Sequence, residues 1–520
     1  MFEILRSIDW SDHLPAMPAG SVALVGAGPG DPSLISLRGA IRILQADTIV
    51  YDALANEALL RLGAPQAERI YVGKRAGVHK MGQEQINDLL VDLAKTGKRV
   101  ARLKGGDPLI FGRGSEEAER LRQAGLPFEI VPGITAAAGA AAYAGIPLTD
   151  RRFTSTLAFV TGHEDPTKEE SAIDYAALAR LGSIVLYMGL RTLGGHAAAL
   201  IRAGMDPATP AAVVSRATLP RQKAVTCTLV EIAGRAEAAG IEAPALTLIG
   251  GAVSLREQIN WFERLPLFGR TVVVTRTRHQ ASELAAQLTA LGAEVIEAPT
   301  IDLAPGDEAA IDEALSDLRS YQWLIVTSVN GVAALVEAMR RHGLDARALG
   351  HVRIGAIGSA TADALRQHFL KADVVPESFT AEDLAEALRR ADDFCGRKVL
   401  LFRADIARPA LTDTLRSLGA ECTECSAYRI LKPAALPQEL LEALQAGRVD
   451  WITFTSSSTF QNLRELLGDD EKQLRDVKLA SIGPITSQTI RTAGLEPTVE
   501  ASPYTVDALV RAIVEYEKGA

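Results

Sequence analysis

The stretch that decides the fold of the first half is SVALVGAGPGDPSLISLRGAIRILQADTIVYD, residues 21–52. An apolar run, SVALVGAG, is followed by a loop rich in Gly and Pro, an amphipathic segment and a second apolar run, TIVYD. This is the strand, loop, helix and strand order of a βαβ unit. The same rhythm continues with short connections, which predicts an α/β layer structure.

A helix is predicted in QEQINDLLVDLAKTG, residues 83–97. Its apolar residues recur at the i, i+3, i+4 and i+7 spacing of one helix face: Ile86, Leu89, Leu90 and Leu93. Gly97 follows as a stop signal.

The second half contains an internal duplication. TVVVTRTRHQASELAAQLTALGAEV, residues 271–295, matches KVLLFRADIARPALTDTLRSLGAEC, residues 398–422. Later segments repeat in the same order, with WLIVTSVNGVAAL from Trp323 echoed by WITFTSSSTFQNL from Trp451. We therefore expect two similar α/β lobes that follow one another along the chain and face each other across a cleft. Each should present Ser/Thr-rich turns at the carboxyl ends of its strands, where ligands bind in open parallel sheets.

The segment WFERLPLFG contains Pro and Gly and reads as a junction between the two halves. We predict an N-terminal extension over residues 1–20, a first unit over 21–263, a linker over 264–269 and a second unit over 270–520.

Composition excludes several classes of protein. The chain of 520 residues has a formal net charge of −9, which argues against a sequence-blind nucleic-acid binder. Its apolar stretches are too short for a bilayer span, and residues 1–20 lack the continuous apolar run of a signal peptide. A cytoplasmic protein that binds neither nucleic acid nor membrane is expected.

The cysteines and histidines also agree with a cytoplasmic protein. Four scattered cysteines suit a reducing cytosol: Cys227, Cys395, Cys422 and Cys425. The last two form a CxxC, but no second pair accompanies them, so we interpret them as ordinary thiols. The histidines form no ligand motif, and no catalytic metal is expected.

Two glycine-rich loops carry the chemistry of the first half. GAGPGD, residues 26–31, fails the dinucleotide fingerprint because Asp31 takes the place of the third glycine, which disfavours a nicotinamide-dependent reductase. RLKGGDPLIFGRG, residues 102–114, is more informative. Gly105 and Gly106 allow a flat ligand to lie against backbone, and Asp107 supplies a carboxylate for a sulfonium or ammonium group. A tight turn with a solvated Asp107 is the plainer alternative.

The ordered motifs VGAGPGDPSLISLRGA, ADTIVYDAL, YVGKRAG, RLKGGDPLIFGRG, VPGITAAAGAAAYAGIPLT, VTGH, LYMGL and TPAAVV resemble uroporphyrinogen-III C-methyltransferases over residues 21–262. The resemblance implies a two-lobed tetrapyrrole methyltransferase fold, S-adenosylmethionine as methyl donor and a homodimer formed through this half. It also implies two successive methylations of uroporphyrinogen III that yield precorrin-2, for siroheme or cobalamin synthesis.

The resemblance also assigns roles to residues of these motifs. It implies cofactor contacts at Pro29, Gly105, Gly106, Asp107, Ile110, Thr135, Ala136, Met188 and Ala217. Asp52 matches the proposed proton acceptor and Lys74 the proposed proton donor. Positioning explains much of such a reaction, because the sulfonium is already activated, and a carboxylate can take the proton that the alkylated ring must lose.

The substrate's carboxylates need basic partners, and guanidinium binds carboxylate bidentately. The candidates are Lys74, Arg75, Arg113, Arg151 and Arg152. Each could equally be a solvated surface charge. Two departures from the family pattern stand nearby: Asp150 where His is usual, and Ser115 where Gly is common.

In the second half, hydroxyl-bearing turns are the only candidate site: Thr327, Ser328, Ser359, Thr361, Thr455, Ser456, Ser457 and Thr486. These hydroxyls could instead cap the helices that follow each strand. Both roles are compatible, because helix N-termini with free amides also bind carboxylates.

The ordered motifs VVVTR, LGAEVIEAPTI, IVTSVNGV, AIGSATADAL, CSAYRI, TFTSSS and SIGPITSQTI resemble uroporphyrinogen-III synthase from Gly269 onward. The resemblance implies a duplicated two-lobed α/β fold and cofactor-free closure of hydroxymethylbilane to uroporphyrinogen III. It places Tyr428 as a cleft tyrosine that assists loss of the substrate hydroxyl.

Two alternatives remain from the sequence. The first half could methylate another corrinoid carbon. The second half could be a two-lobed ligand-sensing module rather than an enzyme.

Overall fold

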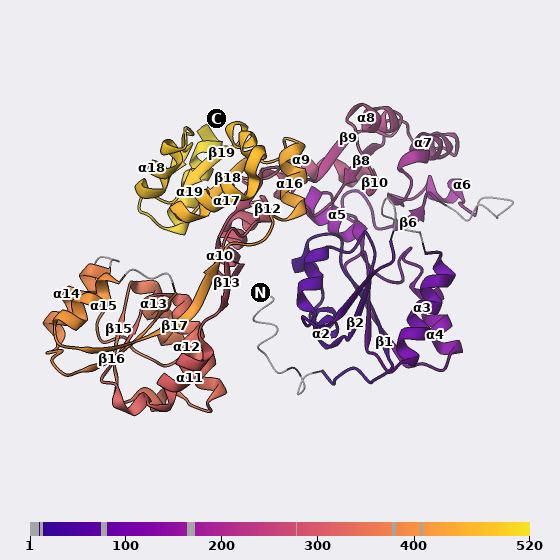
Figure 1. The fold of residues 1–520 in the computed structure, drawn as a ribbon. Coiled ribbons are helices and arrows are strands. Elements are labelled where there is room, and N and C mark those ends of the chain that lie inside the picture. Colours follow the sequence, from indigo (N-terminus) through magenta and orange to yellow (C-terminus); the bar gives the residue numbers. More distant parts are fainter. Residues whose placement is uncertain are drawn as a thin grey trace. The chain divides into compact units, whose positions relative to one another are not determined.

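The computed structural model describes Trp10 and residues 14–73, 81–163, 172–276, 278–376, 381–405 and 409–519. Its contacts divide the chain into two units. The first comprises Met1–Arg270 with Leu288–Glu294, and the second comprises Thr271–Gln287 with Val295–Ala520. Each contains two five-stranded sheets (Figure 1).

The first sheet of the first unit is parallel throughout, in the order β3-β2-β4-β1-β5. Its strands are β1 (Val22–Gly26), β2 (Thr48–Tyr51), β3 (Glu68–Tyr71), β4 (Val100–Lys104) and β5 (Phe128–Val131). Its helices are α2 (Leu37–Gln45), α3 (Gln83–Lys95) and α4 (Gly114–Gln123), with short 3₁₀ turns at Pro32–Leu34 and Glu57–Leu62.

Two apolar cores lie on opposite faces of this sheet because side chains alternate along a strand. Val22 and Leu24 of β1 join the core with α3 and α4, whereas Ala23 and Val25 join the core with α2. The helix expected over residues 83–97 is confirmed. It is α3, which buries Ile86 and Leu90 and is followed by Gly97 at φ +86°.

The second sheet is mixed, in the order β6-β7-β10-β8-β9. Only β6 and β7 are parallel neighbours. Its strands are β6 (Leu157–Thr161), β7 (Ser183–Tyr187), β8 (Pro210–Ser215), β9 (Lys223–Thr228) and β10 (Ala245–Gly250). The helices of this part are α5 (Ala136–Ala144), α6 (Tyr175–Leu178), α7 (Leu193–Arg202), α8 (Ile232–Ala238) and α9 (Arg256–Ile259).

The second unit contains sheets in the orders β12-β11-β18-β19-β20 and β13-β17-β16-β14-β15. The first comprises β11 (Thr271–Val274), β12 (Glu294–Glu297), β18 (Trp451–Phe454), β19 (Lys478–Ser481) and β20 (Val499–Glu500), with helices α10 (Arg278–Ala290), α16 (Gln438–Gln445), α17 (Ser457–Leu467), α18 (Pro484–Thr492) and α19 (Val506–Gly519). The second comprises β13 (Asp302–Pro305), β14 (Trp323–Val326), β15 (Arg353–Ala356), β16 (Lys398–Ala404) and β17 (Glu421–Leu431), with helices α11 (Glu308–Ser316), α12 (Val329–Arg341), α13 (Ser359–Gln367), α14 (Ala381–Ala391) and α15 (Ala410–Ser417).

The expectation that these lobes follow one another along the chain is wrong. Strand β11, which opens the first repeat, pairs with β18 of the second repeat, with Val272 opposite Trp451. Strand β16, which opens the second repeat, pairs with β14 of the first, with Val399 opposite Trp323. Each sheet is therefore built from both repeats, which have exchanged their opening strands.

The duplication is visible in a repeated cluster of an indole, an acid and a base. Trp323 Nε1 donates to Asp392 Oδ2 at 3.0 Å, and the Arg353 guanidinium lies 4.4 Å from the indole centroid. In the other sheet Trp451 Nε1 donates to a Glu517 carboxylate oxygen at 3.0 Å, while Lys478 lies 5.2 Å from the ring. Each base sits opposite its tryptophan in register, so the clusters are equivalent.

Among the described residues, no helix combines the length and the apolar character needed to cross a membrane.

Candidate active sites

Two glycine-containing loops meet at the carboxyl ends of β1 and β4. Gly28 N donates to Gly106 O at 3.2 Å, and Gly106 N donates to Gly28 O at 2.7 Å. Gly106 has φ +69°, and among the described residues a Cβ built there would meet, within 4 Å, only Ala136 N at 3.4 Å and Thr135 Cα at 3.8 Å. The backbone at Gly106 therefore borders open space beside the start of α5.

Asp107 organises this second loop. Its Oδ1 accepts a hydrogen bond from Leu109 N at 2.8 Å, and its Oδ2 accepts one from Gly133 N at 3.0 Å. The carboxylate expected to meet a cation thus also ties two backbone segments together.

The turn that holds Pro29 is fixed from the second sheet and from α5. A Cβ added at Gly139 of α5 would lie 2.5 Å from Pro29 Cβ and Cγ, so helix and turn touch. Asp31 N donates to Thr218 Oγ1 at 2.9 Å, and Thr218 adjoins Ala217 in the loop after β8. The small residues of α5 allow this close approach.

Tyr187 lies next to the remaining predicted cofactor residues. Its hydroxyl lies 2.7 Å from Thr135 Oγ1 and accepts from Ala137 N at 3.1 Å. Burial raises the pKa of Tyr187, so the phenol stays protonated, and either hydroxyl can be the donor in the contact with Thr135. Ile110, Ala136 and Ala217 pack against the same apolar cluster as Tyr187, and the next residue, Met188, is 53% exposed.

Backbone strain is concentrated in these loops. Non-glycine residues with positive φ occur there at Phe111, Arg113, Met188, Arg216 and Thr218. Such conformations cost energy and persist where the surroundings enforce them, often at binding sites. The structure thus brings the predicted cofactor residues onto contacting loops with a strained backbone and exposed apolar side chains.

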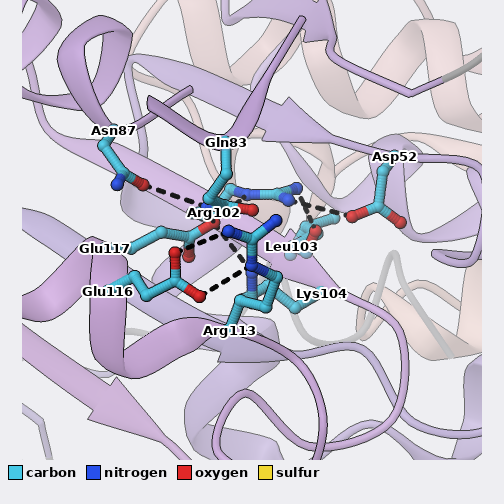
Figure 2. A network of polar contacts seen from close by, with 9 residues as sticks. All are labelled: Asp52, Gln83, Asn87, Arg102, Leu103, Lys104, Arg113, Glu116 and Glu117. Carbon is cyan, nitrogen blue, oxygen red and sulfur yellow. Dashed lines mark hydrogen bonds and ion pairs between the residues drawn. The ribbon is translucent and has the colours of Figure 1, made fainter. Parts of the chain in front are cut away.

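Asp52 lies at the edge of a network of charges (Figure 2). Its Oδ2 accepts from Arg102 Nη2 at 2.9 Å, and its Oδ1 accepts from Leu54 N at 3.0 Å. Arg102 and Lys104 of β4 both contact Glu117 of α4, at 3.3 and 2.8 Å. Burial and the charge of Arg102 lower the pKa of Lys104.

Sequence reasoning missed this set of charges, although one signal was present. Arg102 and Lys104 interrupt the strand VARLK, whose residues are all buried, and a charge in a buried strand requires a partner. Nothing in the sequence identifies Glu117 as that partner, because the contact depends on how α4 packs on β4. Tyr187 was missed as well, since it reads as an ordinary aromatic residue at the end of a strand.

The proposed basic partners of the substrate are only partly described. Lys74 and Arg75 lie outside the described residues. Arg113 and Arg151 are exposed, and Arg113 pairs with Glu116 at 2.7 Å. Arg152 pairs with Asp150, and that contact lowers the pKa of the Asp150 carboxyl to about 2.

In the second unit, Tyr428 and Ser328 come together. Their hydroxyl oxygens lie 3.0 Å apart at the start of α12, where Ser328 Oγ also accepts from Gly331 N. Ser456 caps α17 in the same way by accepting from Thr459 N. The capping interpretation is therefore correct for both serines, and both stand where the backbone amides of a helix N-terminus are available.

The other predicted hydroxyls differ in exposure. Ser359 is exposed, whereas Thr327 and Ser457 are half-buried. Thr361 and Thr486 are buried in the first turns of α13 and α18, where their side chains face the protein interior. Their predicted contact with substrate stays a prediction.

Cys422 and Cys425 do not form a paired site. Three residues apart on β17, they point to opposite faces of the sheet and pack in different cores. Within the described ranges no group of three or more His, Cys, Asp or Glu side chains could hold a metal ion.

Different families of known proteins match the first and the second part of the chain. Residues 21–233 match the family described as Tetrapyrrole (Corrin/Porphyrin) Methylases, and residues 282–511 match that described as Uroporphyrinogen-III synthase HemD. The "Porphyrin biosynthesis protein HemD" of Ruminiclostridium josui is 37% identical over 506 residues, which is 97% of this chain and 99% of that protein. The chain belongs to this HemD family. It is an enzyme that joins a tetrapyrrole methyltransferase to a uroporphyrinogen-III synthase.

Two further relatives cover the methyltransferase half of this HemD-family chain. The "S-adenosyl-L-methionine-dependent uroporphyrinogen III methyltransferase" of Methanosarcina barkeri is 51% identical over 239 residues, 46% of this chain and 94% of that protein. A solved uroporphyrin-III C-methyl transferase of Thermus thermophilus, complexed with S-adenyl homocysteine, is 37% identical, with a TM-score of 0.39 over 45% of this chain and 99% of that one. The family, the fold class, the two enzyme classes and the methyl donor predicted from the sequence are confirmed.

Proposed function

We propose that the N-terminal half methylates uroporphyrinogen III twice, giving precorrin-2, and that the C-terminal half supplies this substrate by closing hydroxymethylbilane. The observation that carries the methyltransferase assignment is the open backbone at Gly106, bordered by Ala136 and held against the Pro29 turn. S-adenosylmethionine fits this surface because a flat, partly apolar ligand needs backbone contacts and small residues, which Gly105, Gly106 and Ala136 provide.

S-adenosylmethionine supplies an activated methyl group, and the protein residues position the substrate and move protons. The pyrrole carbon attacks, so no protein nucleophile is needed, and orientation accounts for much of the rate. The methylated ring is cationic and loses a proton, which Asp52 accepts. Arg102 and Leu54 hold both carboxylate oxygens of Asp52, which fixes the direction in which it faces the substrate.

In the synthase half, the capped starts of α12 and α17 bind substrate carboxylates through backbone amides, and Tyr428 assists loss of the hydroxyl. The contact between Tyr428 and Ser328 supports this role, because it orients the phenol at such a helix start. Restraint of the linear substrate contributes the rest.

The test uses the whole chain. With hydroxymethylbilane alone it should form the type III isomer, whereas spontaneous closure gives type I. With S-adenosylmethionine added, the product should carry two transferred methyl groups in the precorrin-2 positions. A single methyl group, or methylation at another carbon, would contradict the methyltransferase proposal. Type I alone would contradict the synthase proposal and favour a ligand-sensing module.

Two variants in the same chain serve as mutual controls. Asp52→Asn should lower methylation by about 10²–10⁴ while leaving isomer formation unchanged, because an amide cannot accept the proton. Tyr428→Phe should affect only isomer formation. We also propose that the enzyme works in the cytoplasm as a homodimer formed through its methyltransferase half, which light scattering of the purified chain would test.

A further inference from the structure

A balanced set of buried charges lies beneath Asp52. Arg102 and Lys104 project from β4 with side chains 3% and 4% exposed, and Glu117 of α4 is fully buried between them. With Asp52 the set contains two acids and two bases, so its formal charges cancel. Buried charges are costly unless they are paired, so the arrangement depends on each member.

Glu117 fixes the position of the Arg102 guanidinium. Glu117 Oε1 accepts from Arg102 Nε at 3.3 Å, from Lys104 Nζ at 2.8 Å and from Gln83 Nε2 at 3.2 Å. Arg102 Nη1 donates to Leu103 O at 2.8 Å. Only Nη2 then reaches Asp52, whose Oδ2 it contacts at 2.9 Å (Figure 2).

The two oxygens of Glu117 differ in their contacts. Among the residues that the structure describes, Glu117 Oε2 has no hydrogen-bond partner, although it is buried. The carboxylate is therefore committed to the basic pair and to Gln83. Its charge also raises the pKa of Lys104 against the lowering by burial and by Arg102, which helps to keep that lysine charged.

We propose that Glu117 is a positioning residue for methyl transfer, which acts through Arg102 to hold the carboxylate of Asp52 in its working orientation. This rests on the proposed role of Asp52 as proton acceptor. Among the described residues, Glu117 makes no hydrogen bond or ion pair with Asp52 or with a position assigned to substrate or cofactor, and Arg102 is the residue that contacts both Glu117 and Asp52. Loss of its charge should leave cofactor binding intact and slow the step that uses Asp52.

The test is Glu117→Gln in the full chain. Its matched control is Glu119→Gln, which removes the same charge from an exposed position of the same helix. Glu117→Gln should lower kcat for methylation by roughly tenfold to a hundredfold, as expected of a residue acting through another's hydrogen bonds. The Kd for S-adenosylmethionine should change by less than about threefold, and Glu119→Gln should match wild type. Synthase turnover in the same sample gives the concentration of active chain.

A double-mutant cycle distinguishes positioning from a general structural effect. If Glu117 acts only through Asp52, adding Glu117→Gln to Asp52→Asn should produce no further loss. An equal further loss in that background, or weaker cofactor binding, would overturn the inference while leaving Asp52 as the base. Wild-type methylation by Asp52→Asn would instead overturn the proposed function itself.

A less disruptive variant covers the case in which Glu117→Gln does not fold. Arg102→Lys keeps the buried charge but cannot contact Glu117 and Asp52 in the same way, and it should give the same loss of kcat without loss of cofactor binding. Full activity in Arg102→Lys would contradict the proposal that Glu117 acts on Asp52 through Arg102.

Discussion

Gly139→Ala should weaken cofactor binding even though it improves the helix. In the interior of α5, alanine is favoured over glycine by about 1 kcal/mol. The added Cβ, however, would lie 2.5 Å from Pro29 Cβ and Cγ and 3.1 Å from Thr218 Cγ2. The proline ring is rigid, so the turn that carries Pro29 has to move, at the cost of about 1–3 kcal/mol typical of overpacking.

If the overpacking destabilises the conformation of the turn that binds the cofactor by this amount, the affinity for S-adenosylmethionine should drop by roughly 5- to 150-fold. Titration calorimetry with S-adenosylmethionine measures the Kd, and urea unfolding measures stability. The control is Gly234→Ala in α8, where a Cβ meets no atom of the described residues within 4 Å. That variant should gain about 0.5–1 kcal/mol of stability and bind normally. Unchanged affinity in folded Gly139→Ala would refute the argument that the contact between α5 and the turn shapes the cofactor site.

Three further outcomes are expected. Tyr428→Phe should slow isomer formation by less than about a hundredfold, which is below the range of an essential general acid, because the amides at the helix starts remain. Quenched-flow isomer analysis measures the rate, and a larger loss would show that the phenol is essential. Trp451→Phe should lower the free energy of unfolding of its lobe by about 1.5–3 kcal/mol, measured by urea unfolding, because it removes the donor to buried Glu517. A variant as stable as wild type would refute a role for the cluster of Trp451, Glu517 and Lys478. Burial raises the pKa of Cys425 to about 11, so at pH 8 its thiol stays protonated and should react with a disulfide reagent only on unfolding, whereas exposed Cys395 reacts at once.

Local patterns explain what the sequence predicted well. The spacing of apolar residues in α3 and the glycines of the loop after β4 are local signals, because they depend only on residues nearby in the sequence. Each can therefore be recognised without knowledge of the fold. The charge network is different. Arg102 and Lys104 signal only that a partner exists, and the choice of Glu117 is made by the packing of α4 against β4. Burial of Thr361 and Thr486 likewise follows from helix orientation, which a list of hydroxyls in turns does not contain.

The exchange of strands between the repeats has a direct effect on the synthase site. Tyr428 belongs to the second repeat, yet it lies on β17 in the sheet that carries Ser328 of the first repeat, and the two hydroxyls meet only because β16 and β17 crossed over. In the other lobe, Thr300 of the first repeat touches the start of α17 by donating to Thr459 O at 3.2 Å. The two lobes thus place corresponding segments at corresponding helix starts, but one supplies a fully buried threonine and the other a half-buried tyrosine. The proposed role of Tyr428 agrees with this difference, because an acid that assists departure of the substrate hydroxyl is needed only once.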